Sequence, residues 1–153
     1  MSELRLRRRI LGIDLGKARV GLSVSDELGM LAHPLETIPA SDNVLARIGE
    51  IVTAKDIEKV VIGLPRHMNG SMGTGAAEAV AFAEKLRGRV GCEVVTWDER
   101  LTTMAANRAL RESGRRAKNS RGVVDQVAAQ IILQSYLDAG AGTAFPAADP
   151  TDS

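Results

Sequence analysis

The sequence is poor in cysteine, histidine and aromatic residues, and each shortage excludes a kind of site. The single cysteine, Cys92, cannot form an intrachain disulfide, and one cysteine with two histidines cannot supply a conventional four-ligand zinc site. Aromatic residues make up 3% of the chain, so Trp97 is expected to belong to the core rather than to a base-stacking platform. Cys92 is expected to be a small buried hydrophobe, and a reducing cytoplasm fits this composition best.

Long hydrophobic runs are also absent. No apolar stretch approaches the roughly 18 residues that a membrane span requires, which predicts a soluble protein. The basic segment from Arg5 to Arg9 resembles the first part of a signal peptide, but Asp14 and Gly16 interrupt the apolar stretch that would have to follow it. No export signal is therefore expected.

Length and hydrophobic content predict one domain. The chain has 153 residues, of which 44% are hydrophobic, and this is enough to bury one sizeable core. Residues 1–139 are expected to form the domain. Residues 140–153, with many small residues and two prolines, are expected to be a disordered tail.

The net charge of +1 hides two basic segments on an otherwise acidic chain. Residues 1–20 carry +4 and residues 108–121 carry +5, so the remaining residues sum to −8. This distribution indicates a local footprint for a polyanion, and a solvated basic surface is the alternative that the sequence leaves open.

Apolar periodicity predicts an α/β fold with a mixed sheet. Strands are expected at 10–15, 20–25, 30–38, 59–64 and 94–97, and helices at 43–55, 76–87, 103–112 and 123–137. The first three strands follow one another as an antiparallel meander, whereas the later strands alternate with helices and so require parallel crossovers. The expected result is a five-stranded mixed sheet covered by helices, with residues 114–122 as an exposed basic loop.

Acidic residues end or interrupt three of these elements. Asp14 shares one face of the first strand with Ile10 and Gly12, and Gly12 is expected to clear space beside the carboxylate. Asp98 and Glu99 end the fifth strand, which places carboxylates at the carboxyl edge of the same sheet.

The third element is the last helix, where Asp125 extends the apolar face formed by Ala129, Ile132 and Tyr136. A charge there is costly unless a cation meets it. Each acid also has a structural explanation, as a turn residue, a strand-end group or a carboxylate in a first helical turn. Together, carboxylates from two strand ends and a facing helix can converge, and hard oxygen ligands without His or Cys suit Mg²⁺ or Mn²⁺.

Several motifs, in order along the chain, resemble the YqgF family. They are GIDLGKARVG at 12–21, VIGLP at 61–65 with MNGS at 68–71, DERLTT at 98–103, and DQVAA at 125–129 with ILQSYL at 132–137. The DERLTT motif is the most specific, and the initial Asp-x-Gly alone would be weak. Ala18 stands where the family commonly has Arg or Thr, and Asn69 where Asp is usual. Neither departure changes an acidic residue, so both bear on how the substrate is recognised rather than on the chemistry.

The YqgF family resembles RuvC-type Holliday-junction resolvases, has the RNase H-like fold and is described as pre-16S rRNA nucleases. The resemblance implies a metal-dependent phosphodiesterase with active-site acids at Asp14, Glu99 and Asp125, and with Asp98 as a neighbour whose share in the metal site stays open. It also implies two Mg²⁺ or Mn²⁺ ions about 4 Å apart, one lowering the pKa of the attacking water and the other stabilising the leaving 3′ oxygen. Candidates for phosphate contacts are Lys17, Arg19, Arg100, Arg116 and Lys118.

More than one function stays open. The implied reaction is 5′-end processing of pre-16S rRNA in ribosome biogenesis, and the alternative is resolution of branched DNA junctions, for which a homodimer is favoured over a monomer. A catalytically silent nucleic-acid-binding protein would bind in a salt-sensitive manner without cleaving. Actin-like ATPases and sugar kinases also have Asp-x-Gly after a first strand, but they need two domains, which 153 residues cannot supply.

Overall fold

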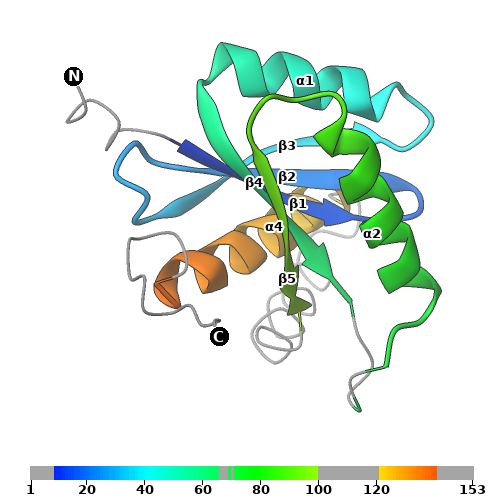
Figure 1. Cartoon of the computed structure of the whole chain (residues 1–153). Coiled ribbons are helices and arrows are strands. Elements are labelled where there is room, and N and C mark those ends of the chain that lie inside the picture. Colours follow the sequence, from blue (N-terminus) through cyan, green and yellow to red (C-terminus); the bar gives the residue numbers. More distant parts are fainter. Residues whose placement is uncertain (1–8, 66–68, 70, 100–120, 141–153) are drawn as a thin grey trace.

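The computed structural model describes residues 9–65, 69, 71–99 and 121–140, and these form a five-stranded sheet with helices on both faces (Figure 1). The strands are β1 (Arg9–Leu15), β2 (Arg19–Ser25), β3 (Ala32–Pro39), β4 (Ile57–Leu64) and β5 (Glu93–Asp98). Their order across the sheet is β3-β2-β1-β4-β5. The pairs β1–β2 and β2–β3 are antiparallel, and β1–β4 and β4–β5 are parallel. The predicted mixed sheet is confirmed.

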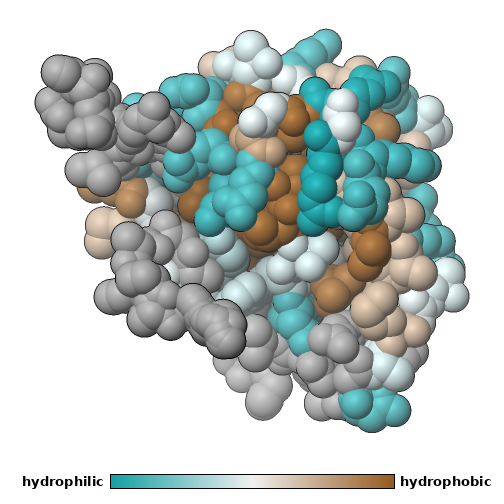
Figure 2. Space-filling model, in the orientation of Figure 1, coloured by the Kyte–Doolittle hydropathy of each residue, from teal (hydrophilic) through white to brown (hydrophobic). Residues whose placement is uncertain are grey.

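The two faces of the sheet carry separate apolar cores, because side chains alternate along each strand. On one face, Ile13 belongs to a core that α1 (Val44–Ala54) and α2 (Thr74–Arg87) cover. On the other face, Ile10 packs in a smaller core with α4 (Arg121–Asp138). Figure 1 shows the resulting layers, with α1 and α2 on one side of the sheet and α4 on the other. In Figure 2, apolar residues are visible in the middle of the same view, surrounded by hydrophilic ones.

Local sequence explains where α1 begins. The side chain of Asn43 caps this helix, since its Oδ1 accepts a hydrogen bond from the backbone N–H of Ala46 at 3.2 Å. One face of α1 then turns to the core. The residues that it buries are Ile48, Ile51 and Val52.

Small residues under α4 let this helix lie close to the sheet. A Cβ atom on Gly12 would clash with Ser23 and lie 2.8 Å from the Cβ of Leu133. The Ser23 hydroxyl is fully buried and donates to the carbonyl oxygen of Ala129 at 2.8 Å. The sequence interpretation of Gly12 therefore named the wrong neighbouring group. The space beside Gly12 is filled by Ser23 and α4 rather than by the carboxylate of Asp14.

Glutamines spaced four residues apart bond α4 to β3, a strand at the edge of the sheet. The side-chain amide of Gln126 donates to Thr37 Oγ1 at 3.1 Å, and that of Gln130 donates to the carbonyl oxygen of Ala32 at 3.0 Å. The side-chain oxygen of Gln134 accepts from the N–H of Ala32 at 2.8 Å. These bonds fix α4 along β3 and occupy backbone groups at the start of this edge strand.

The predicted element boundaries agree with the described ones to within about two residues. The difference matters most at the last helix, which begins at Arg121 rather than at residue 123. The predicted loop 114–122 therefore includes two residues that belong to this helix. The predicted helix 103–112, the rest of that loop and residues 141–153 lie outside the described residues. Among the helices that the structure describes, none is long and apolar enough to cross a membrane.

Candidate active site

Asp14 lies near the end of β1, between two glycines of the neighbouring strands. In β2 the residue paired with Asp14 is Gly21. In β4, Gly63 comes one step beyond the pair formed by Ile13 and Ile62, which brings it beside Asp14. The two glycines leave room on either side of Asp14 for groups that approach from other elements.

Glu99 occupies the room above Gly63. It directly follows β5, and a Cβ atom on Gly63 would clash with the Oε2 atom of Glu99 and lie 2.7 Å from the Cδ1 atom of Ile132. The Glu99 carboxylate is therefore held between β4 and α4. Asp98 is the last residue of β5 and pairs in register with Leu64.

Asp125 occupies the room above Gly21. A Cβ atom on Gly21 would clash with the carbonyl oxygen of Asp125 and lie 3.0 Å from its Cβ. The Nε atom of Arg19, at the start of β2, donates to the Oδ2 atom of Asp125 at 2.7 Å. The cation that the sequence required for Asp125 is therefore Arg19.

The carboxylates interact through their charges. Burial and then the charge of Asp125 raise the pKa of Asp14 from 3.8 to about 6. Burial, the charge of Asp14 and the charge of Asp98 raise the pKa of Glu99 from 4.5 to about 7. Asp14 is thus the centre of an acidic cluster, Asp14–Glu99–Asp125, that three separate elements bring to one end of the sheet.

The acidic cluster fits a divalent cation by its donor chemistry. Carboxylate oxygens are the hard ligands that Mg²⁺ and Mn²⁺ prefer, and a cation would offset the repulsion that raises the pKa values of Asp14 and Glu99. In the described part of the chain, however, no three His, Cys, Asp or Glu side chains are already arranged around one point that could hold a metal ion. Asp125 is engaged by Arg19 instead.

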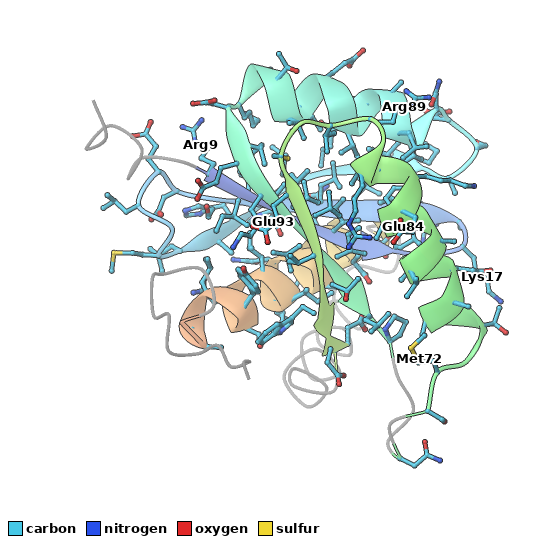
Figure 3. All side chains as sticks on the ribbon, in the orientation of Figure 1. Arg9, Lys17, Met72, Glu84, Arg89 and Glu93 are labelled. Carbon is cyan, nitrogen blue, oxygen red and sulfur yellow. The ribbon has the colours of Figure 1, made fainter. Side chains whose placement is uncertain are left out.

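The predicted phosphate contacts divide into described and undescribed residues. Lys17 is exposed in the turn between β1 and β2, where it lines a surface hollow of about 390 Å³ together with Phe82 and Lys85 of α2. Figure 3 shows Lys17 on the side of the molecule opposite Arg9. Arg19 contacts Asp125, as described above. The predicted contacts that lie outside the described residues are Arg100, Arg116 and Lys118.

Trp97 and Cys92 both pack against the cores, but Cys92 is half-buried rather than buried as predicted. Trp97 contacts Tyr136 edge-on, with the ring centroids 5.4 Å apart, and its Nε1 atom donates to Ser135 Oγ at 3.1 Å. Cys92 packs against the core under α1 and α2, and burial raises the pKa of its thiol. Neither residue takes part in the acidic cluster.

Sequence reasoning missed the positions that make the acidic cluster possible. Gly21 and Gly63 lie inside strands, where glycine weakens the strand and marks a close approach of another group. That signal was present in the sequence. The partner of Arg19 had no such signal, because Arg19 and Asp125 are 106 residues apart.

Relatives from bacteria share nearly half of their residues with this chain. A relative from Listeria monocytogenes serotype 4b (strain CLIP80459) is 46% identical over 134 residues, which are 85% of this chain and 97% of the relative. A relative from Leifsonia xyli subsp. xyli is 48% identical over 144 residues, which are 93% of each chain. Both are named "Putative pre-16S rRNA nuclease".

Solved structures support the predicted RNase H-like fold. RuvC of T. thermophilus in complex with a Holliday junction substrate superposes with a TM-score of 0.59 at 20% identity, over 89% of this chain and 97% of RuvC. A Fowlpox virus resolvase bound to Holliday junction DNA superposes with a TM-score of 0.53 at 10% identity, over 86% of this chain and 97% of the resolvase.

The motifs, the fold and the relatives lead to one family. Residues 8–139 match the family model described as "RuvX: Holliday junction resolvase". The resemblance to the YqgF family that the motifs predicted is confirmed by this match and by the relatives at 46% and 48% identity. The chain belongs to the RuvX Holliday junction resolvase family.

Proposed function

We propose that this protein is a metal-dependent nuclease that hydrolyses phosphodiester bonds in structured RNA and processes the 5′ end of pre-16S rRNA in the cytoplasm. The observation that carries the proposal is the acidic cluster, in which Asp14 stands between Glu99 and Asp125. The names of relatives at 46% and 48% identity support pre-16S rRNA as the substrate.

Each acid has a proposed role. Asp14 is the central metal ligand, because its pKa responds to Asp125 and its charge raises the pKa of Glu99. Glu99 is the second ligand in preference to Asp98, because the Glu99 carboxylate lies over Gly63 beside Asp14. Bound Mg²⁺ or Mn²⁺ ions, two in the proposed mechanism, would supply an activated water and charge stabilisation for the leaving 3′ oxygen.

The surroundings of the acidic cluster position the substrate in this proposal. Lys17 is exposed in the turn that follows β1, so it can contact a phosphate of a chain that passes Asp14. Arg100, Arg116 and Lys118 remain proposed phosphate contacts on the evidence of the sequence alone. Neutralising Arg116 and Lys118 together is expected to weaken binding to many sequences alike.

A second candidate substrate is branched DNA, because the description of the family is that of a Holliday junction resolvase. Paired cuts across a four-way junction favour a symmetric homodimer, whereas cleavage of one RNA strand needs only a monomer. Sedimentation of the protein with a bound four-way junction would therefore show whether one or two copies bind it. Two copies would favour branched DNA as the substrate, and one copy would favour RNA.

Cleavage of precursor 16S rRNA and of a four-way DNA junction, each with Mg²⁺ or Mn²⁺, tests the proposal. Asp14→Asn and Glu99→Gln are expected to abolish cleavage, since a neutral amide keeps the shape of the side chain but weakens cation binding. Asp138→Asn is the matched control, because Asp138 is exposed at the other end of α4. Normal cleavage by Asp14→Asn, or binding of both nucleic acids without any cleavage by the wild-type protein, would refute the proposal.

A further inference from the structure

Arg19 makes a direct contact with a member of the acidic cluster. Its Nε atom lies 2.7 Å from the Oδ2 atom of Asp125, a charge-assisted hydrogen bond between the start of β2 and the beginning of α4. The side chains are 34% and 23% exposed, so the pair is neither fully screened by solvent nor sealed in the core. This contact commits the Nε atom of Arg19 to a carboxylate of the acidic cluster.

The backbone fixes both partners of this contact. Gly21 follows Arg19 by two residues on the same face of β2, and it allows the carbonyl group of Asp125 to lie directly against the strand. α4 is also bonded to the sheet through Ser23 and Gln126. Since the main chains of Arg19 and Asp125 are both held, the contact can change only through the side chains.

The positive charge of Arg19 offsets repulsion among the carboxylates of the acidic cluster. Asp14 and Glu99 repel each other, and Asp125 adds a third negative charge beside Asp14. The guanidinium of Arg19 compensates one of these charges while no metal is bound. In the described part of the chain no three such side chains already surround one point that could hold a metal ion, and Asp125 is engaged by Arg19.

We infer that Arg19 is the internal counter-cation of the acidic cluster: it holds Asp125 in the metal-free protein, and a divalent cation must displace its guanidinium to recruit Asp125 as a ligand. The inference rests on the metal site of the proposed function. In this inference Arg19 controls the affinity for the metal ion rather than binding a phosphate of the substrate. Removal of its charge should therefore tighten metal binding, because both the competition for Asp125 and the repulsion of the incoming cation disappear.

Calorimetric titration with Mn²⁺ alone tests this inference. Arg19→Gln keeps a hydrogen-bond donor but loses the charge, and its Kd for Mn²⁺ is expected to fall roughly tenfold, a modest effect for a unit charge a few ångströms from a divalent ion. Arg19→Lys keeps the charge and should remain within about threefold of the wild type on the same grounds. Arg9→Met is the matched control, an arginine at the start of β1 that pairs with Glu27 at 3.5 Å and lies on the side opposite Lys17 (Figure 3).

Thermal unfolding provides a second readout. In EDTA, Arg19→Gln should melt at a lower temperature than the wild type because Asp125 loses its compensating charge, and saturating Mn²⁺ should raise its melting temperature by more than it raises that of the wild type. Binding of nucleic acid in EDTA should be unchanged, because Asp125 compensates the charge of Arg19 in the metal-free protein. A weaker binding of nucleic acid with a reduced salt slope would instead identify Arg19 as a phosphate contact and overturn the inference.

The outcomes separate this inference from the proposed function. If Asp14→Asn abolishes Mn²⁺ binding and Arg19→Gln leaves the Kd unchanged or raises it, the metal site stands and the counter-cation is refuted. If the wild-type protein binds no Mn²⁺, both fail. A tighter Kd in Arg19→Gln, together with a wild-type value in Arg9→Met, supports the displacement of Arg19.

Discussion

Replacing Asp14 by asparagine is expected to stabilise the metal-free protein at alkaline pH. The pKa of Asp14 is raised from 3.8 to about 6, first by burial and then by the charge of Asp125. A carboxyl group whose pKa is higher in the folded state favours folding most below its unfolded pKa and loses that contribution as the pH rises through the folded value. Ionised Asp14 therefore opposes folding above pH 6, and asparagine removes this effect.

The magnitude follows from the two pKa values. A tenfold change in a proton-binding constant corresponds to about 1.4 kcal/mol, so a rise from 3.8 to about 6 destabilises the folded protein by ~3 kcal/mol at pH 8. Roughly half of this develops between pH 5 and pH 8, since the unfolded group is already ionised at pH 5 and the folded group is not. For a chain of 153 residues, 1 kcal/mol shifts the melting temperature by about 3 °C.

Thermal unfolding in EDTA at several pH values measures this effect. The melting temperature of Asp14→Asn minus that of the wild type should widen by about 4 °C between pH 5 and pH 8. Saturating Mg²⁺ should reverse the order, because the wild type binds the ion and the variant does not. A difference that stays constant with pH would show that Asp14 titrates normally, and the argument from burial and Asp125 would then be wrong.

Two further predictions concern the packing of α4 on the sheet and the binding of the substrate. Gly21→Ala should destabilise the protein by about 1–3 kcal/mol and reduce cleavage, because the new Cβ would clash with the backbone of α4. Gly49→Ala, at a helical position with open space around it, should instead stabilise by about 1 kcal/mol, and equal melting temperatures of the two variants would contradict the close packing of α4. Lys17→Gln should weaken binding of RNA and lower the slope of log affinity against log salt by about 1, which a salt series measures; an unchanged slope would leave Lys17 as solvated surface.

Alternation of apolar residues was sufficient to predict the sheet. Val20, Leu22 and Val24 face one side of β2 while the residues between them are small, so both the strand and its two faces could be predicted. The predicted start of α1 at residue 43 is one residue early, because Asn43 caps the helix with its side chain rather than belonging to it. Gly122 was less informative. It was read as the end of a loop, yet it lies inside α4, where packing against the sheet outweighs the weak helix propensity of glycine.

The acidic cluster was only partly predictable, because its parts meet across long separations in sequence. The three acids could be chosen from their places at the ends of apolar elements and from the family motifs. The need for a cation beside Asp125 also followed from the sequence, but its identity did not, since several arginines and lysines were equally available. Arg19 became distinct only when β2 was placed against α4.

α4 carries both a catalytic acid of the proposed mechanism and the apolar side chains that cover one face of the sheet. A chain in which this helix has come loose exposes Ile10 and Val61 and at the same time loses Asp125 from the acidic cluster. Local opening of α4 would therefore expose apolar surface and dismantle the acidic cluster in the same event. Under the proposed mechanism, a molecule that has lost the packing of this helix is also inactive, so folding of α4 and activity are coupled.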